Sequence, residues 1–165
     1  MTICQLDECS NSSKITKECN NSGKAQVYRF PKLLKGKSDN EILKILLTKE
    51  NPLITFDKEI VHENRPATPE TNPGLIILKN APSIPDTMND KNALRILNKF
   101  KGHFPRWNEI SWRNSIITIT QEYIVIEHIS EGKIIKDKYI KYDDPSFNSC
   151  LEEILNKNSQ NNPTG

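Results

Sequence analysis

Residues 115–142 read SIITITQEYIVIEHISEGKIIKDKYIKY, and this stretch decides the fold expected for the second half of the chain. Valine, isoleucine, threonine and tyrosine dominate it, and these residue types favour β-strands. Three strands are predicted, over Ser115–Thr120, Tyr123–Ile129 and Lys133–Tyr142. Apolar and polar residues alternate in the second and third strands, which is typical of half-buried strands. Because Glu131-Gly132 is a typical hairpin turn between them, we expect antiparallel pairing.

A predicted helix lies on each side of these strands. The first begins at Asn89 or Asp90, and Gly102 and Pro105 limit its end. Its apolar residues are Leu94, Leu97, Phe100 and Phe104. The second begins at Asp144-Pro145, an N-cap followed by a first-turn proline. Its apolar residues recur at the spacing of one helix face and are Phe147, Cys150, Leu151, Ile154 and Leu155.

The predicted fold class is therefore α+β. An α-β-β-β-α domain with an antiparallel sheet is expected over residues 89–157, followed by a disordered polar tail over residues 158–165. The order of its elements is similar in outline to a double-stranded-RNA-binding domain. The lysine- and alanine-rich helix start of that family is replaced here by Asp144–Cys150, so the similarity covers the architecture and not the function.

Upstream of this domain, residues 66–88 are predicted to be a proline-rich linker. The apolar run Leu75–Leu78 inside it is expected to be a strand or a docking motif. Further upstream, Ser38 and Glu41 form a predicted capping box, in which each side chain bonds the backbone of the other residue. The helix that this box opens is expected over Glu41–Lys49.

Charge is unevenly distributed, although the formal net charge of the 165 residues is only +2. Between Lys14 and Lys49 there are nine basic residues against three acidic ones, and between Lys91 and Arg113 six against one. Such blocks favour a local anion-binding surface. The alternative is that they are the solvated faces of ordinary helices.

The compartment expected from the sequence is intracellular and reducing. No apolar run approaches the roughly 20 residues that cross a bilayer, and the first residues lack the basic and apolar regions of a secretory signal. The four cysteines are therefore expected to be thiols or metal ligands, without a disulfide framework.

Cys4 and Cys9 have a spacing at which one short loop points two thiolates at a tetrahedral zinc. Together with the basic segment ending in Phe30-Pro31, the helix that follows and His62, they resemble the THAP-type zinc finger. The resemblance covers residues 1–65. It implies a small module of short strands plus a helix, a bound zinc, and sequence-specific DNA binding in the nucleus for transcription regulation.

The zinc ligands that the resemblance implies are Cys4, Cys9, Glu59 and His62. Glu59 stands where the family has its third cysteine, and Cys19 is an alternative fourth ligand. The sequence also departs from the family in lacking the helix tryptophan and in having Glu63 after the histidine. In a second interpretation the module binds no metal and is held by apolar packing, with these residues: Phe30, Ile42, Ile45, Leu46 and Phe56.

For DNA, the resemblance implies phosphate contacts from basic residues of the N-terminal module, namely Lys24, Arg29, Lys32, Lys35 and Lys37. Alternatively, these lysines only solvate a loop. The second basic block is interleaved with Phe104, Trp107 and Trp112. Aromatic residues beside cations bind unpaired bases in some proteins, but tryptophans next to strands more often anchor a core or an interface. We expect Trp107 and Trp112 to contact a partner protein.

Catalysis has little support in the sequence. The three histidines, His62, His103 and His128, fall in different segments without a nucleophile motif, and there is no phosphate-binding glycine loop. The expected function is a non-enzymatic, nucleic-acid-associated regulator or adaptor without a small-molecule substrate. It contacts DNA through the N-terminal module and a partner protein through the α/β domain. The alternative is an interaction subunit of a larger assembly, with neither metal nor direct DNA binding.

Overall fold

The computed structural model describes residues 2–6, 25–28, 38, 41, 52–56 and 70–161. For β1 and β2 the backbone alone is described. The elements in chain order are β1 (Thr2–Leu6), β2 (Ala25–Tyr28), β3 (Leu53–Thr55), β4 (Leu75–Leu78), α4 (Asp90–His103), β5 (Ile116–Ile119), β6 (Tyr123–Ser130), β7 (Lys133–Lys141) and α5 (Phe147–Gln160). No helix in this part of the chain is both long and apolar enough to cross a membrane.

The order α4-β5-β6-β7-α5 confirms the predicted α-β-β-β-α succession. β5 pairs antiparallel with β6, and β6 antiparallel with β7. The predicted turn between β6 and β7 has φ angles of 51° at Glu131 and 77° at Gly132. Two successive positive φ values give the turn a twist that matches the strands it joins, which explains the tight hairpin.

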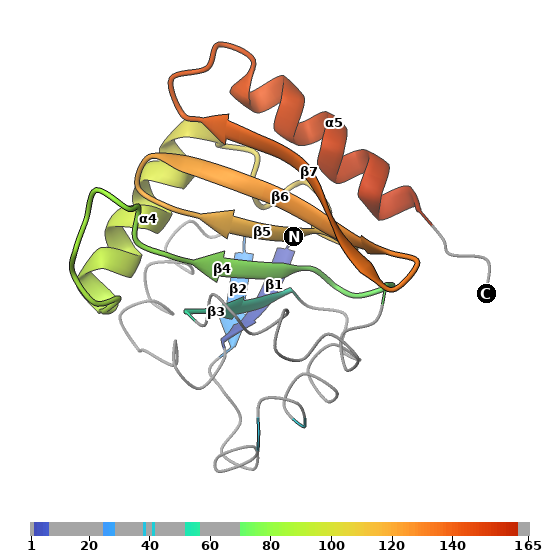
Figure 1. The fold of residues 1–165 in the computed structure, drawn as a ribbon, viewed down its shortest axis with the longest axis horizontal. Helices are drawn as coiled ribbons and strands as arrows, with labels where there is room; N and C mark the ends of the chain where they lie inside the picture. The colour runs from blue at the N-terminus through green and yellow to red at the C-terminus, as the bar shows by residue number, and fades with distance from the viewer. Residues whose placement is uncertain are drawn as a thin grey trace.

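The sheet is mixed, so the prediction of an antiparallel sheet is wrong for the sheet as a whole. β4 pairs parallel with β5, and β3 parallel with β4. The full strand order is β2-β1-β3-β4-β5-β6-β7, with β7 at one edge (Figure 1). Parallel neighbours need a long crossover connection. The chain between β4 and β5 contains α4 and provides that crossover. The strand alternative for Leu75–Leu78 is confirmed, but its parallel pairing with β5 was not predicted.

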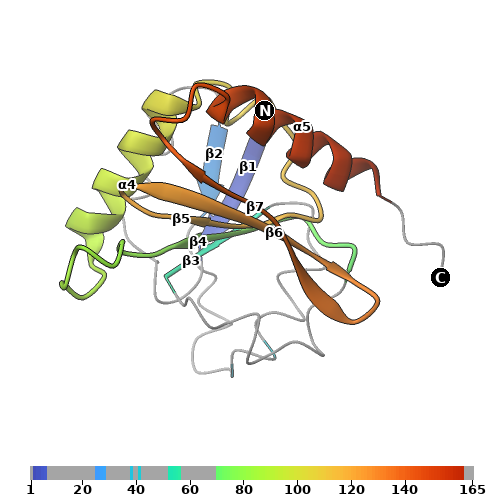
Figure 2. The ribbon, with the colours of Figure 1, turned by 45° about the horizontal axis from the view of Figure 1, so that its top comes forward.

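Both helices cover the same face of the sheet (Figures 1 and 2). Ile96 and Phe100 of α4, with Leu151 and Leu155 of α5, belong to one buried apolar core. The sheet contributes one side chain from every second position of its strands, including Ile76, Ile117, Ile119, Ile124 and Ile126. Burying each such side chain contributes about 1.5–3 kcal/mol relative to leaving it in water. Both predicted apolar stripes therefore face this core.

The central strands are buried on their second face as well. Leu75 and Ile77 of β4 and Ile116 of β5 are almost completely inaccessible, although they point away from the two helices. Strands buried on both sides have continuous apolar sequences instead of alternating ones. The LIIL sequence of β4 is therefore that of an inner strand.

Local capping contacts define where the helices begin. Asn89 is the N-cap of α4, and its side-chain oxygen accepts from the backbone N–H of Asn92 at 3.0 Å. The predicted capping box is confirmed, because Ser38 and Glu41 exchange two backbone-to-side-chain hydrogen bonds of 3.3 Å. Glu41 is helical, and the remainder of the predicted helix lies outside the described residues.

The start of α5 differs slightly from the prediction. The helix begins at Phe147, and Asp144 precedes it. The Asp144 carboxylate accepts from the backbone N–H and the hydroxyl of Ser146 at 2.8 and 2.7 Å. These bonds lower the pKa of Asp144, the Ser146 hydroxyl contributing most. α5 also extends to Gln160, three residues beyond the predicted end of the domain.

Candidate functional site

A β-bulge in the β6–β7 hairpin brings together a cluster of polar side chains. Ile126 is opposite Lys138 and Glu127 is opposite Lys136, so Asp137 is one extra residue on β7. A bulge of this kind redirects a side chain out of the normal alternation. The Asp137 carboxylate lies 2.9 Å from Nδ1 of His128, and the two side chains are 17% and 20% exposed. Because an ionised carboxylate only accepts, Nδ1 carries the proton of this bond.

Asn158 connects this pair to the inner strands. Its side-chain nitrogen donates to Ser115 Oγ at 3.0 Å and to the Asp137 carboxylate at 3.2 Å. Asn114 in turn donates to the backbone oxygens of Asn158 and Asn161, at 2.9 and 3.0 Å. The last carbonyls of a helix have no partner within the helix. Two buried asparagines therefore fix the end of α5 to the hairpin and to the residues just before β5.

Two hollows of about 250 and 570 Å³ open beside this cluster, and His128, Asn158 and Asn161 line both. Glu70 and Glu131 line the smaller one. Nε2 of His128 remains available for a hydrogen bond, because Nδ1 is held by Asp137. Within the described residues no three His, Cys, Asp or Glu side chains gather as metal ligands. The hydrogen bonds of Asp137 and Asn158 are internal, so the cluster acts mainly to join α5 to the hairpin.

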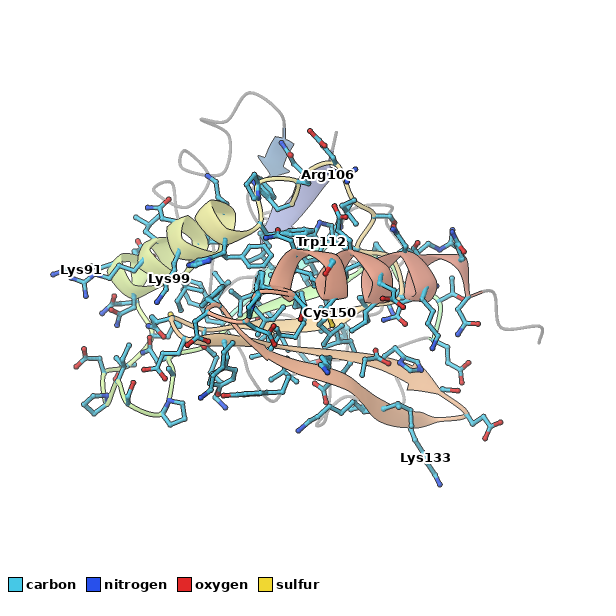
Figure 3. All side chains as sticks on the ribbon, turned by 90° about the horizontal axis from the view of Figure 1, so that it is seen from above. Lys91, Lys99, Arg106, Trp112, Lys133 and Cys150 are labelled. Carbon is cyan, nitrogen blue, oxygen red and sulfur yellow. The ribbon has the colours of Figure 1, made fainter. Side chains whose placement is uncertain are left out.

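A row of cations lies on the exposed side of α4. Lys91, Arg95 and Lys99 are four residues apart, which places them on one face over about 12 Å of helix. All three are exposed, and no ion pair within the described residues neutralises them. The Lys99 ammonium lies 5.4 Å from the centre of the Tyr142 ring, so the row ends beside β7. Figure 3 shows Lys91 and Lys99 on α4, with Lys133 far from them at the hairpin tip.

The outer face of the β6–β7 hairpin carries two tyrosines and two lysines, which we call the tyrosine–lysine surface. The ring centres of Tyr123 and Tyr139 are 4.6 Å apart, and Tyr139 is 45% exposed. Lys141 is opposite Tyr123, and Tyr139 is opposite Val125, two residues further along each strand. The side chains of these four residues therefore lie on one face of the sheet. Lys136, opposite Glu127, is returned to this face by the bulge. The pKa of Tyr123 is raised above its ordinary value, chiefly by burial and then by the negative charge of the ionised forms of Tyr139 and Glu122.

The two predicted partner-binding tryptophans lie together. Trp112 is 2% exposed, its ring centre is 5.8 Å from that of Phe100, and Nε1 donates to the Trp107 carbonyl at 2.9 Å. Trp107 is half-buried, and the Lys101 ammonium lies 5.5 Å from the centre of its ring. Trp112 therefore packs in the core, while Trp107 lies at its boundary with solvent.

Of the predicted zinc and DNA residues, only Cys4 lies within the described residues. Cys4 lies in β1, where its backbone pairs with Val27. Three predicted zinc ligands lie outside the described residues, namely Cys9, Glu59 and His62, and so do Lys24, Lys32, Lys35 and Lys37. Arg29 follows β2 and also lies outside them. Zinc and DNA binding by the N-terminal module therefore remain predictions.

Sequence reasoning noted Lys91, Arg95 and Lys99 as part of a basic block but not as a row. Their i, i+4, i+8 spacing is a signal that was available in the sequence. The tyrosine–lysine surface was missed, because placing Lys136 beside Tyr139 requires knowledge of the bulge. Comparison of the chain with protein-family models, with curated proteins and with solved structures finds no match.

Proposed function

We propose that this chain is a nucleic-acid-associated regulatory or adaptor protein that acts in the nucleus and catalyses no reaction. The observation that carries the proposal is the row of Lys91, Arg95 and Lys99 on α4. Like charges four residues apart destabilise a helix by about 0.2–0.5 kcal/mol per pair. Within the described residues these three cations have no ion-pair partner, and the phosphates of a polyanion would remove their repulsion.

Lysines of β7, outside the second basic block, support the same function. β7 adds four exposed lysines along the sheet edge, Lys133, Lys136, Lys138 and Lys141. Lys141 precedes Tyr142, whose ring contacts Lys99, so the α4 row and the end of β7 form one basic surface. In the proposed protein this surface adds phosphate contacts to those expected from the N-terminal module. Cys4, Cys9, Glu59 and His62 would hold a structural zinc in that module.

Salt-dependent binding tests this function in the full-length chain. Affinity for a labelled DNA duplex and for labelled single strands is measured by fluorescence anisotropy at increasing salt. We expect K91Q/R95Q/K99Q to weaken binding and to reduce the slope of log K against log salt by about 2 to 3, because three phosphate contacts are lost. The control variant K79Q/R113Q/K157Q removes the same charge from outside both the row and β7.

Two results would contradict the proposal. One is that the full-length chain binds neither nucleic acid form at low salt. The other is that both triple variants reduce the slope equally, since the row would then contribute only general charge.

A second candidate function is a protein-interaction subunit, which the half-buried Trp107 and the exposed Ile135 on β7 favour. β7 is an edge strand, and an edge strand can accept another chain. Its four lysines oppose such pairing, because charged side chains protect sheet edges. A packed apolar interface responds little to salt, so the same titration separates the two functions.

A further inference from the structure

We propose that the partner of the basic surface is a single-stranded nucleic acid, and that an unpaired base stacks on Tyr139 of the tyrosine–lysine surface. This inference rests on the proposed function and names its ligand. Tyr139 is one of two large apolar side chains that are clearly exposed in the described residues. Its ring packs against Tyr123 at 4.6 Å between centres, which holds it in place before any ligand arrives.

The chemistry of stacking explains why this ring suits a base. Aromatic side chains beside cations bind single strands, because every base offers a flat face while lysines contact the backbone. Lys136 and Lys141 flank the tyrosine pair on the same face, and Lys138 lies between them on the sheet edge. Glu127 and Glu122 are the nearby acids. A double helix hides its base faces, so it cannot use Tyr139 in this way.

The tyrosines also lie close to the α4 row. Tyr139 and Tyr142 are three residues apart at the end of β7, which is about 10 Å along an extended chain. Tyr142 contacts Lys99, the last cation of the row. A single strand that follows Lys91, Arg95 and Lys99 therefore reaches Lys141 and Tyr139 by passing around the sheet edge. Phosphates bind along α4, and the base binds at the hairpin.

The experiment measures the affinity of the full-length chain for labelled oligo-dT, oligo-U and a DNA duplex of equal length. We expect tighter binding to a single strand than to the duplex. Y139L should weaken single-strand binding about tenfold or more, because the stacking of one base is lost. Its salt slope and its affinity for the duplex should stay unchanged, since no phosphate contact is removed. Y139F keeps the ring and should bind like the wild type. The two oligonucleotides distinguish DNA from RNA as the source of the strand.

Three results would overturn the inference. If Y139L retains full single-strand affinity while K91Q/R95Q/K99Q weakens binding of both forms, the proposed function stands and the stacking site does not. If Y139L weakens duplex binding as much as single-strand binding, the substitution has damaged the hairpin. If poly-glutamate competes as well as oligo-dT at equal charge, the partner is an acidic protein.

Discussion

Gly74 occupies a position where only a hydrogen fits. Its φ is 112°, a left-handed conformation that residues with a side chain rarely adopt. A Cβ atom built there would lie 2.5 Å from the Trp112 carbonyl oxygen and 2.9 Å from the Trp112 Cβ. Neither residue can move away easily. Trp112 is buried in the core, and the carbonyl oxygen of Gly74 accepts a hydrogen bond from the backbone N–H of Leu53 at 3.0 Å. This close approach brings the loop before β5 against the start of β4.

At this scale we predict that G74A destabilises the protein by more than about 1 kcal/mol, since it adds both a steric clash and an unfavourable φ. Urea denaturation of the full-length chain measures the change. The matched control is G102A in α4, where nothing lies within 4 Å of the added Cβ. Alanine favours a helix over glycine, so the control should gain about 0.5–1 kcal/mol. Equal effects of the two substitutions would contradict the steric explanation.

The buried hydroxyl of Tyr142 also has a hydrogen-bond partner. The Tyr142 hydroxyl donates to the Thr120 carbonyl at 2.8 Å, and burial raises the pKa of Tyr142 well above its ordinary value. The neutral hydroxyl is therefore the form that the folded state favours. Its ring contacts two residues of α4, with its centre 5.4 Å from the Lys99 ammonium and 4.8 Å from the centre of the His103 imidazole. One tyrosine thus joins the core to the basic surface.

At the scale of the elements, α5 is held to the sheet by hydrogen bonds near its end. Asn158 is 4% exposed and donates to both Ser115 and Asp137. The bulge at Asp137 and the left-handed Asn114, with φ of 63°, place the groups that meet it. These bonds fix the last turn of the helix across the sheet. They also hold the bulge that places Lys136 beside Tyr139.

We predict that N158A lowers the free energy of unfolding by about 1–3 kcal/mol, because it leaves buried hydrogen-bonding groups without their partner. Thermal or urea denaturation tests this. N156A is the control, since Asn156 lies two residues earlier on the same helix and is exposed. Its effect should stay within about 0.5 kcal/mol. A loss in N156A as large as in N158A would show that general helix propensity is responsible.

At the scale of the whole molecule, the described residues contain two groups of exposed cations, one on α4 and one on β7. The overall charge of +2 hides this arrangement, because acidic residues fill the segments between. Figure 3 shows that Lys91 and Lys99 lie together while Arg106 lies apart. Arg106 is paired with Glu109 and Glu152 at 3.2 and 2.8 Å, so it belongs to the internal ion pairs. The proposed nucleic-acid surface is therefore defined by where its exposed cations lie, and the net charge of the chain does not reveal it.

The prediction at this scale concerns the metal of the N-terminal module. We expect about one zinc per full-length chain by elemental mass spectrometry, because the THAP resemblance implies Cys4, Cys9, Glu59 and His62 as its four ligands. C4S should lose the metal, whereas C150S should keep it, because Cys150 lies on α5 beside the core. A folded wild-type chain without zinc would contradict the metal site and favour the apolar-packing interpretation of the module.

By itself, the sequence determined the local structure of the second half. Periodic apolar residues predicted both helices, alternation and β-branched residues predicted β5, β6 and β7, and Glu131-Gly132 predicted the turn. These signals act between residues close in the chain, so they can be read without the fold. The capping box at Ser38 and Glu41 belongs to the same class.

Only the tertiary structure decided how these elements combine. The parallel place of β4 depends on contacts between residues about 40 positions apart, such as Leu75 with Ile116, which no local pattern encodes. Likewise, Asn158 looks like part of a polar tail until Ser115 and Asp137 are brought to it. The bulge at Asp137 redirects one side chain toward α5 and another toward Tyr139. The surface proposed to bind a single strand thus exists only once the sheet has formed, because its residues come from strands and a helix that packing alone places together.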